Sequence, residues 1–307
     1  MTVFDYLEPH SVRQALSMLH KYGEDARIVG GSTDFLIRWR TGVWSPKYVV
    51  NLQHIPSLHL IKYSPRNGLR IGALVTVQEI ERNQMIRSKY PAFAAGATSF
   101  AGVQIRNLAT IGGNICNASP AGDTLPSLLS LAAKFKIVGP NGMRYVVADE
   151  FFVGPGKTVL ENGEILTEIC IPSPPYGSGS FYIKHSPRGA MDISAVGVAS
   201  NVSISKDGLV CKDVKIALGS VSGTPIRAYG AEAKLLGYPI TKELITDVSE
   251  TAASIASPID DIRASAEYRE LIVPVLVRRT LNKAISIAGG GGTDFDEQRR
   301  LTIQATF

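Results

Sequence analysis

Apolar and polar residues alternate along this chain with two periods, one typical of amphipathic helices and one typical of strands. Between Ser11 and Gly23 the apolar residues recur at helical spacing, which predicts an amphipathic helix with a serine cap and a glycine stop. Residues 26–29 then form a short apolar run of the strand type. This predicted strand leads directly into Gly30 and Gly31, so a glycine turn is expected to follow it.

Further short elements are predicted before residue 150. Residues 47–52 and 68–73 have strand patterns. Thr76 and Glu79 have the spacing of a capping box, which predicts the start of a helix. Residues 141–142 are Asn-Gly between two strand-like segments, which predicts a hairpin. This part of the chain is therefore expected to mix short strands with short helices.

The composition changes at residues 172–180, where IPSPPYGSGS combines prolines, glycines and serines. We interpret this stretch as a linker or a domain edge, because such residues interrupt regular structure. We therefore predict one domain over residues 1–175 and a second over 176–288. The polar, glycine-rich residues 289–307 are expected to form a mobile tail.

The predicted second domain begins with strands and continues with helices. Two long alternating strands are expected over about residues 193–204 and 209–219. Three helical segments follow, near residues 228–236, 242–256 and 266–287. A small sheet followed by helices is an α+β arrangement.

Composition and charge exclude several classes of protein and of partner. The 307 residues are 45% apolar and 19% charged, which excludes collagen, a coiled coil and wholesale disorder. The net charge of +5 is spread without long basic runs, so neither nucleic acid nor a membrane is expected as a partner. The three cysteines form no C-x-x-C pair, so no metal or iron–sulfur site is expected within this chain. Asp5 and Glu8 near the start do not fit a secretory signal, and we expect a cytoplasmic protein.

Two glycine pairs are the strongest candidates for ligand binding. Gly30-Gly31 and Gly112-Gly113 each follow an apolar stretch and precede small polar residues. Such loops let main-chain N–H groups approach a phosphate closely, although glycine pairs also mark ordinary turns. Two loops so distant in sequence would have to converge to hold one diphosphate. No G-x-G-x-x-G follows a strand, and a P-loop is excluded because Phe151 stands where its first glycine is required.

Two other residues have both a structural and a functional interpretation. Cys116 lies in a small-residue loop without a basic partner nearby in sequence, so a buried thiol is favoured over a nucleophile. Asp123 precedes a predicted helix and is either a cap or a carboxylate that accepts hydrogen bonds from ligand hydroxyls. Sequence spacing leaves both roles of Asp123 open, and we assign no catalytic residue.

Residues 100–129, FAGVQIRNLATIGGNICNASPAGDTLPSLL, resemble the FAD-binding medium subunit of molybdenum hydroxylases, the family of xanthine dehydrogenase and carbon monoxide dehydrogenase. The T-I-G-G-N element is the most specific part of this resemblance. Four other segments are similar to the family in the same order along the chain: VGGSTDFLIRWRTG (29–42), EILTEICIP (164–172), GSVSGTPIRA (219–228) and YRELIVPVLVRRTL (268–281).

The resemblance implies a PCMH-type FAD-binding domain, an α+β fold shared with vanillyl-alcohol oxidase, followed by a smaller α+β domain of the carbon monoxide dehydrogenase flavoprotein C-terminal type. It also implies which residues bind FAD. These are the first loop, Ile28, Val29, Gly30, Gly31, Ser32, Thr33, Asp34 and Phe35; the second loop, Thr110, Ile111, Gly112, Gly113 and Asn114; and Phe100, Ala101, Asp123, Leu166 and Lys184.

One position departs from the family pattern, and one residue carries a further hypothesis. Ser32 occupies the second glycine position of the common A-G-G-T-D-L-L sequence, so it must avoid a positive φ or tolerate its cost. Asp123 is expected to bind the polyol or ribose hydroxyls of the cofactor, and Leu166 to pack against its ring system. Lys184 is expected near the flavin, where it would stabilise negative charge on the reduced ring.

The resemblance implies an electron-transfer role within a larger enzyme. A large partner subunit would carry the molybdenum–pterin cofactor and a small partner subunit two [2Fe–2S] clusters, with FAD in this chain passing electrons to an external acceptor. A dimer of heterotrimers is the implied assembly. Two alternatives remain open: a self-sufficient flavin oxidase of the same fold, and an assembly module whose flavin loops have decayed.

Overall fold

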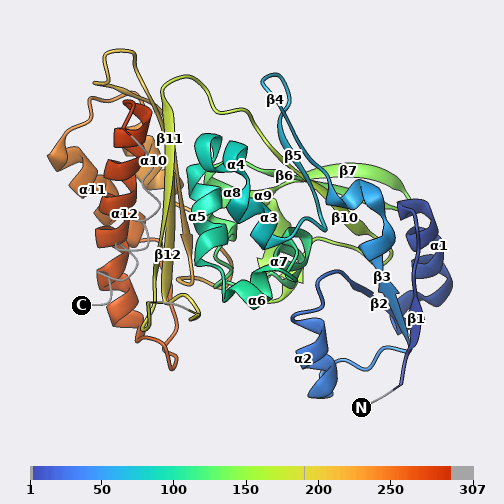
Figure 1. Cartoon of the computed structure of the whole chain (residues 1–307). Helices are drawn as coiled ribbons and strands as arrows, with labels where there is room; N and C mark the ends of the chain where they lie inside the picture. Colours follow the sequence, from blue (N-terminus) through green and yellow to red (C-terminus); the bar gives the residue numbers. More distant parts are fainter. Residues whose placement is uncertain (1–2, 190, 292–307) are drawn as a thin grey trace. The chain divides into compact units, whose positions relative to one another are not determined.

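The computed structural model describes residues 3–189 and 191–291 (Figure 1). Most of the predicted tail, residues 292–307, lies outside this described part. The chain divides into two compact units, each built from segments distant in sequence. Of the described residues, the first unit contains 3–79, 103–118 and 133–173, and the second contains 80–102, 119–132, 174–189 and 191–291.

The first unit begins with a small parallel sheet of order β1-β3-β2. Its strands are β1 (Asp5–Leu7), β2 (Ala26–Val29) and β3 (Tyr48–Asn51). Helix α1 (Val12–Tyr22) starts where the Ser11 side chain accepts a hydrogen bond from the Gln14 N–H, and it ends at Gly23 with φ of 50°. Its buried Ala15 and Leu19 share a core with Val50. The predicted capped helix and its glycine stop are thus confirmed.

The same unit contains a five-stranded antiparallel sheet of order β4-β5-β10-β6-β7. Its strands are β4 (Ile61–Ser64), β5 (Gly68–Gly72), β6 (Lys134–Gly139), β7 (Gly142–Val147) and β10 (Ile165–Ile171). Gly142 has a φ of 108° at the hairpin between β6 and β7, which glycine adopts without a steric penalty. The predicted Asn-Gly hairpin is therefore confirmed.

Short elements complete the first unit. They are the 3₁₀ turns at Gly23–Asp25, Leu52–His54 and Pro56–His59, α2 (Phe35–Arg40), α6 (Val103–Arg106), α7 (Ile111–Asn117), α9 (Ala148–Phe151), β8 (Phe152–Gly154) and β9 (Lys157–Thr158). Helix α3 (Val77–Arg82) opens with the predicted capping box, since the Thr76 N–H donates to Glu79 Oε2 at 2.7 Å and the Glu79 N–H to Thr76 Oγ1 at 3.2 Å.

The second unit is built around a four-stranded antiparallel sheet of order β11-β12-β13-β14. Its elements are α4 (Gln84–Lys89), α5 (Pro91–Ser99), α8 (Leu125–Ser130), β11 (Ser178–His185), β12 (Val196–Ile204), β13 (Cys211–Gly219), β14 (Ile226–Arg227), α10 (Tyr229–Leu235), α11 (Lys242–Ala253) and α12 (Ala266–Ala288). The predicted order of strands followed by three helices is confirmed.

Helices cover both faces of this sheet (Figure 1). Phe181 and Ile183 of β11 face the large core shared with α10, α11 and α12. Tyr182, between them, packs with Ala92 and Ala95 of α5 on the opposite face. Successive residues of a strand point to opposite faces, so β11 delivers even-numbered side chains to α5 and odd-numbered ones to α12. This alternation determines where Lys184 points.

Residues 172–180, expected to be a linker or a domain edge, are not a linker throughout, because β11 begins at Ser178 and pairs with β12 from there. Gly179 and Ser180 therefore belong to a strand in spite of their small, polar composition. A Cβ at Gly179 would lie 2.2 Å from the carbonyl oxygen of Ala284, so glycine is needed where α12 crosses the strand.

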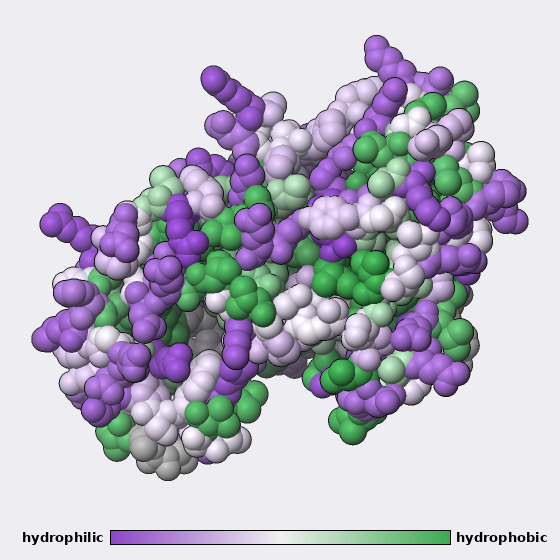
Figure 2. Space-filling model, turned by 180° about the vertical axis from the view of Figure 1, so that it is seen from behind, coloured by the Kyte–Doolittle hydropathy of each residue, from purple (hydrophilic) through white to green (hydrophobic). Residues whose placement is uncertain are grey.

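Apolar residues are exposed at several places on the surface. On the face drawn in Figure 2 they do not form one continuous region. In the first unit, Leu36 and Ile37 of α2 and Val103 and Ile105 of α6 are exposed. None of the helices within residues 3–189 and 191–291 has the length and apolar character needed to cross a membrane.

Candidate functional site

The first glycine loop (residues 30–34) connects β2 to α2 in the first unit. Of the eight residues assigned to this loop from sequence, Ile28 and Val29 belong to β2 and Phe35 begins α2. In the part of the chain that the structure describes, the main-chain N–H groups of residues 31–34 donate no hydrogen bond. Successive unpaired N–H groups in a turn form a concave donor set that suits an anion such as a diphosphate.

Ser32 occupies the family's glycine position and has a φ of 59°. The residue therefore tolerates the left-handed conformation instead of avoiding it. For a residue with a Cβ atom this conformation costs about 1–2 kcal/mol. The hydroxyl gives little in return, because its only hydrogen bond in the described residues is a 3.5 Å contact to the Gly30 carbonyl oxygen.

Replacing Ser32 by glycine is expected to raise the free energy of unfolding by about 0.5–1 kcal/mol, the relief of strain minus the greater flexibility of glycine in the unfolded chain. Urea unfolding followed by circular dichroism would measure it. Ser32→Ala is the matched control, since it removes the hydroxyl and keeps the positive φ, and it should show no gain. A Ser32→Gly variant less stable than the wild type would contradict this account of the loop.

The second glycine segment (residues 110–114) forms the first turn of α7. Most of its N–H groups already donate hydrogen bonds within the first unit. The Ile111 N–H donates to the Val75 carbonyl at 2.9 Å, the Gly112 N–H to the Ala73 carbonyl at 2.8 Å and the Gly113 N–H to Thr110 Oγ1 at 3.1 Å. Both glycine pairs were expected to offer N–H groups to a phosphate, and the structure differs: the N–H groups of Gly112 and Gly113 are paired, whereas those of residues 31–34 are unpaired among the described residues.

The two glycine segments lie against each other, as a shared diphosphate site would require. A Cβ at Gly30 would be 3.1 Å from Thr110 Oγ1, and one at Gly31 would be 1.9 Å from the Leu108 carbonyl oxygen. Gly112 is equally constrained, since its Cβ would be 2.6 Å from the Ala73 carbonyl oxygen. These glycines are thus required by the packing of the chain on itself, a reason that the sequence did not reveal.

A polar bridge that sequence reasoning missed joins the two segments. The side-chain amide of Asn117, at the end of α7, accepts a hydrogen bond from Arg38 Nη2 at 2.8 Å and donates one to Asp34 Oδ1 at 3.4 Å. Arg38 lies on α2, one helical turn after Asp34. Asn117 is separated from both residues by about 80 positions in sequence, so no local pattern could have indicated the pairing.

Cys116 and Leu166 of the first unit are both buried to an extent that bears on their expected roles. Cys116 is partly exposed as a residue, yet burial of its thiol raises its pKa to about 12. The thiol is therefore protonated at neutral pH, which disfavours a nucleophilic role. Leu166 is 4% exposed within β10, and its expected contact with a cofactor ring stays a prediction.

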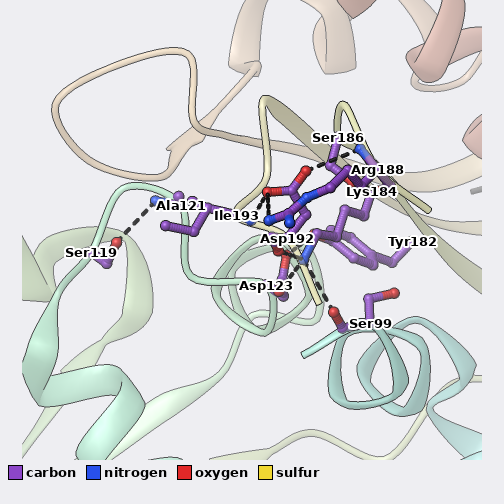
Figure 3. Close-up of polar contacts among 10 residues, drawn as sticks. All are labelled: Ser99, Ser119, Ala121, Asp123, Tyr182, Lys184, Ser186, Arg188, Asp192 and Ile193. Atoms are coloured by element: carbon purple, nitrogen blue, oxygen red, sulfur yellow. Dashed lines mark hydrogen bonds and ion pairs between the residues drawn. The ribbon is translucent and has the colours of Figure 1, made fainter. Parts of the chain in front are cut away.

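In the second unit, Asp123 and Lys184 form a buried ion pair (Figure 3). Lys184 Nζ lies 2.8 Å from Asp123 Oδ2, and the Tyr182 hydroxyl donates to Asp123 Oδ1 at 3.1 Å. Burial raises the pKa of Asp123, and the ammonium and the hydroxyl oppose that shift. Asp123 is therefore neither a simple cap nor a free acceptor: both its carboxylate oxygens already have partners.

Lys184 uses all three of its ammonium protons within the same unit. Besides Asp123, it donates to the Ser99 carbonyl at 3.1 Å and to the Asp192 carbonyl at 2.7 Å (Figure 3). The ammonium thus ties the end of α5 to the strand β11 and to the loop that follows it. Phe100 and Ala101 come directly after α5 and are partly exposed, and Ala101 has a φ of 39°. The roles of these residues in cofactor binding stay predictions.

Comparison with known proteins identifies the families that the two parts of the chain match. Residues 2–174 match the family described as FAD binding domain in molybdopterin dehydrogenase, and residues 181–284 match the CO dehydrogenase flavoprotein C-terminal domain. A xanthine dehydrogenase FAD-binding subunit of Escherichia coli O157:H7 is 31% identical, over 94% of this chain and 99% of that protein. The carbon monoxide dehydrogenase medium chain of Hydrogenophaga pseudoflava is 32% identical, over 92% of this chain and 96% of that protein.

Solved structures agree with this assignment. A chain of the Hydrogenophaga pseudoflava carbon monoxide dehydrogenase superimposes with a TM-score of 0.87, covering 92% of this chain and 96% of that chain at 32% identity. The expected pair of folds, an FAD-binding domain followed by a flavoprotein C-terminal domain, is confirmed.

Proposed function

Because this chain belongs to the family of FAD-binding subunits of molybdopterin-dependent dehydrogenases, we propose that it is the electron-transfer subunit of a heteromeric molybdenum hydroxylase. In this proposal a small partner subunit supplies electrons from [2Fe–2S] clusters, and the flavoprotein delivers them to an external acceptor. The observation that carries it is the first glycine loop: its N–H groups at residues 31–34 have no partner among the described residues, and its glycines pack against Thr110 and Leu108.

The residues of the first unit fit the diphosphate of FAD. Residues 31–34 offer consecutive N–H donors, and the hydroxyls of Ser32 and Thr33 add two further donors to the same loop. Bound FAD supplies the redox chemistry, and the chain supplies binding, orientation and tuning.

Five residues are proposed to contact other parts of the cofactor. These are Phe100, Ala101, Asp123, Leu166 and Lys184. Lys184 would act on the ring through its positive charge and not through a free proton donor, because its three protons are engaged. Its charge is balanced by Asp123 at 2.8 Å, so a stabilising effect on reduced flavin would depend on both residues together.

The oxidation substrate is proposed to bind on the large molybdenum-containing subunit. The relatives named for xanthine and for carbon monoxide are both similar to this chain over nearly its whole length, at 31% and 32% identity. Their substrates differ greatly in size and chemistry, so a shared flavoprotein architecture is compatible with either. We propose a dimer of heterotrimers as the assembly.

The proposal is tested by titrating the purified full-length chain with FAD and with riboflavin, following the quenching of flavin fluorescence. FAD is expected to bind at least about 100-fold more tightly, because riboflavin lacks the diphosphate that several N–H donors would hold. Equal affinities would contradict the role of the first loop. Mass spectrometry of the polypeptides that co-purify from the native host tests the assembly, and purification of the chain without a molybdenum-containing subunit would favour a self-sufficient oxidase.

A further inference from the structure

We propose that Arg38 and Asn117 are positioning residues: with Asp34 they form a polar bridge that holds the first glycine loop in its donor-presenting conformation. This inference rests on the proposed function, since the loop matters here as a diphosphate site. The three residues will be called the loop bridge. Neither Arg38 nor Asn117 belongs to the set of residues expected to contact FAD.

The loop bridge joins the two glycine segments at a fixed point. Asp34 ends the first loop, and Asn117 ends the helix that the second segment begins. One amide group satisfies both partners, accepting from Arg38 Nη2 at 2.8 Å and donating to Asp34 Oδ1 at 3.4 Å. An amide is suited to this position because it carries an acceptor and a donor on one planar group.

The Arg38 side chain is held in place from a second direction. Its guanidinium lies 4.6 Å from the centre of the Trp44 ring, within the range of a cation–π contact. The main chain reinforces this arrangement, since the Trp44 N–H donates to the Arg38 carbonyl at 3.1 Å. Arg38 is half-buried, whereas Arg40 on the same helix is exposed. These two contacts thus hold the guanidinium in the orientation in which it donates to Asn117.

The first loop needs such support because its N–H groups do not provide it, although the Ser32 and Asp34 carbonyls accept from the N–H groups of Leu36 and Arg38. In the second glycine segment the N–H groups of residues 111–114 donate hydrogen bonds, whereas in the first loop those of residues 31–34 are unpaired among the described residues. Ser32 is also strained at a φ of 59°. Fixing the main chain of each residue costs conformational entropy. A side-chain bridge that orders the loop in advance leaves its N–H groups open and reduces the cost of binding.

The experiment compares Arg38→Gln, Asn117→Ala and the double variant in the full-length chain. Each single variant is expected to raise the Kd for FAD about tenfold, and the double variant should raise it no further than the larger single effect, because all three break the same bridge. Hydrogen exchange of the FAD-free protein should become faster in residues 30–36. Arg40→Gln, which removes the same charge from the exposed side of α2, should change neither quantity by more than about twofold.

The outcomes separate the bridge from the proposed function. If the wild type binds FAD and Arg38→Gln behaves like Arg40→Gln in both measurements, the bridge is overturned and the function stands. If the wild type binds no FAD, the proposed function fails, and exchange in residues 30–36 still decides whether the bridge orders the loop. Arg38→Lys keeps the charge without the guanidinium fork. If Arg38→Gln does not fold, Arg38→Lys takes its place and must show the same faster exchange and weaker binding. Wild-type values in Arg38→Lys would then overturn the bridge.

Discussion

Replacing Asp123 by alanine is expected to lower the free energy of unfolding by about 3–5 kcal/mol, because it leaves the buried Lys184 ammonium without its counter-charge. The side chains of Lys184 and Asp123 are only 4% and 8% exposed, so bulk water screens the ammonium poorly. The Tyr182 hydroxyl loses its acceptor in the same variant. Urea unfolding of the full-length chain measures the difference.

Two further variants test the cause of this loss. Asp247→Ala breaks an exposed ion pair to Lys234 in the same unit, and it should cost at most about 1 kcal/mol. Adding Lys184→Met to Asp123→Ala removes both charges, and it should recover most of the lost stability. A double variant as unstable as Asp123→Ala alone would show that packing, and not the unpaired charge, explains the loss.

Replacing Gly31 by alanine is expected to destabilise the first unit by about 3 kcal/mol or more, because the new Cβ would overlap main-chain atoms that cannot move independently. It would lie 1.9 Å from the carbonyl oxygen of Leu108 and 3.0 Å from the Cα of Ala109. To relieve the overlap, the first loop must move away from the second glycine segment. We therefore expect FAD affinity to fall at least about tenfold as well, measured by fluorescence titration.

Gly230→Ala is the matched control for this substitution. Gly230 lies within α10, and a Cβ there would meet only Thr251 Cγ2, at 3.9 Å. Alanine should therefore stabilise this helix by about 0.5–1 kcal/mol. If Gly31→Ala unfolds at the same urea concentration as the wild type and retains its FAD affinity, the two glycine segments are not packed as closely as described.

Local sequence signals gave most of the secondary structure. The serine and glycine around α1, the capping box at Thr76 and the Asn-Gly hairpin before Met143 each act through neighbouring atoms, so a few residues suffice to specify them. The linker or domain edge expected at residues 172–180 extends less far than expected, for the complementary reason. Gly179 is in a strand because β11 pairs with β12, and glycine is needed there because α12, more than 100 residues later, packs against it.

The candidate site, like the secondary structure, could be predicted from the sequence only where its signals are local. The two glycine pairs were identified from sequence because glycine next to a strand and small polar residues is itself a local pattern. Which pair presents free N–H groups depended on the partners of those groups: the Gly112 N–H is taken by the carbonyl of Ala73, a residue of a distant segment. The loop bridge was invisible in sequence, since Arg38 and Asn117 are ordinary polar residues until the fold brings them to 2.8 Å.

The sequence by itself therefore determined most of the elements, the two folds and the family, because capping, turn geometry, hydrophobic periodicity and specific motifs depend on residues that are close together in the chain. Only the tertiary structure decided that Ser32 has a positive φ and that Asp123 and Lys184 form an ion pair. It also decided that the N–H groups of the first glycine loop are unpaired among the described residues while those of Gly112 and Gly113 are paired. Each of these facts depends on hydrogen bonds and contacts between segments distant in the chain. Such pairings are fixed by the packing of the whole unit and leave no periodic signal in the sequence.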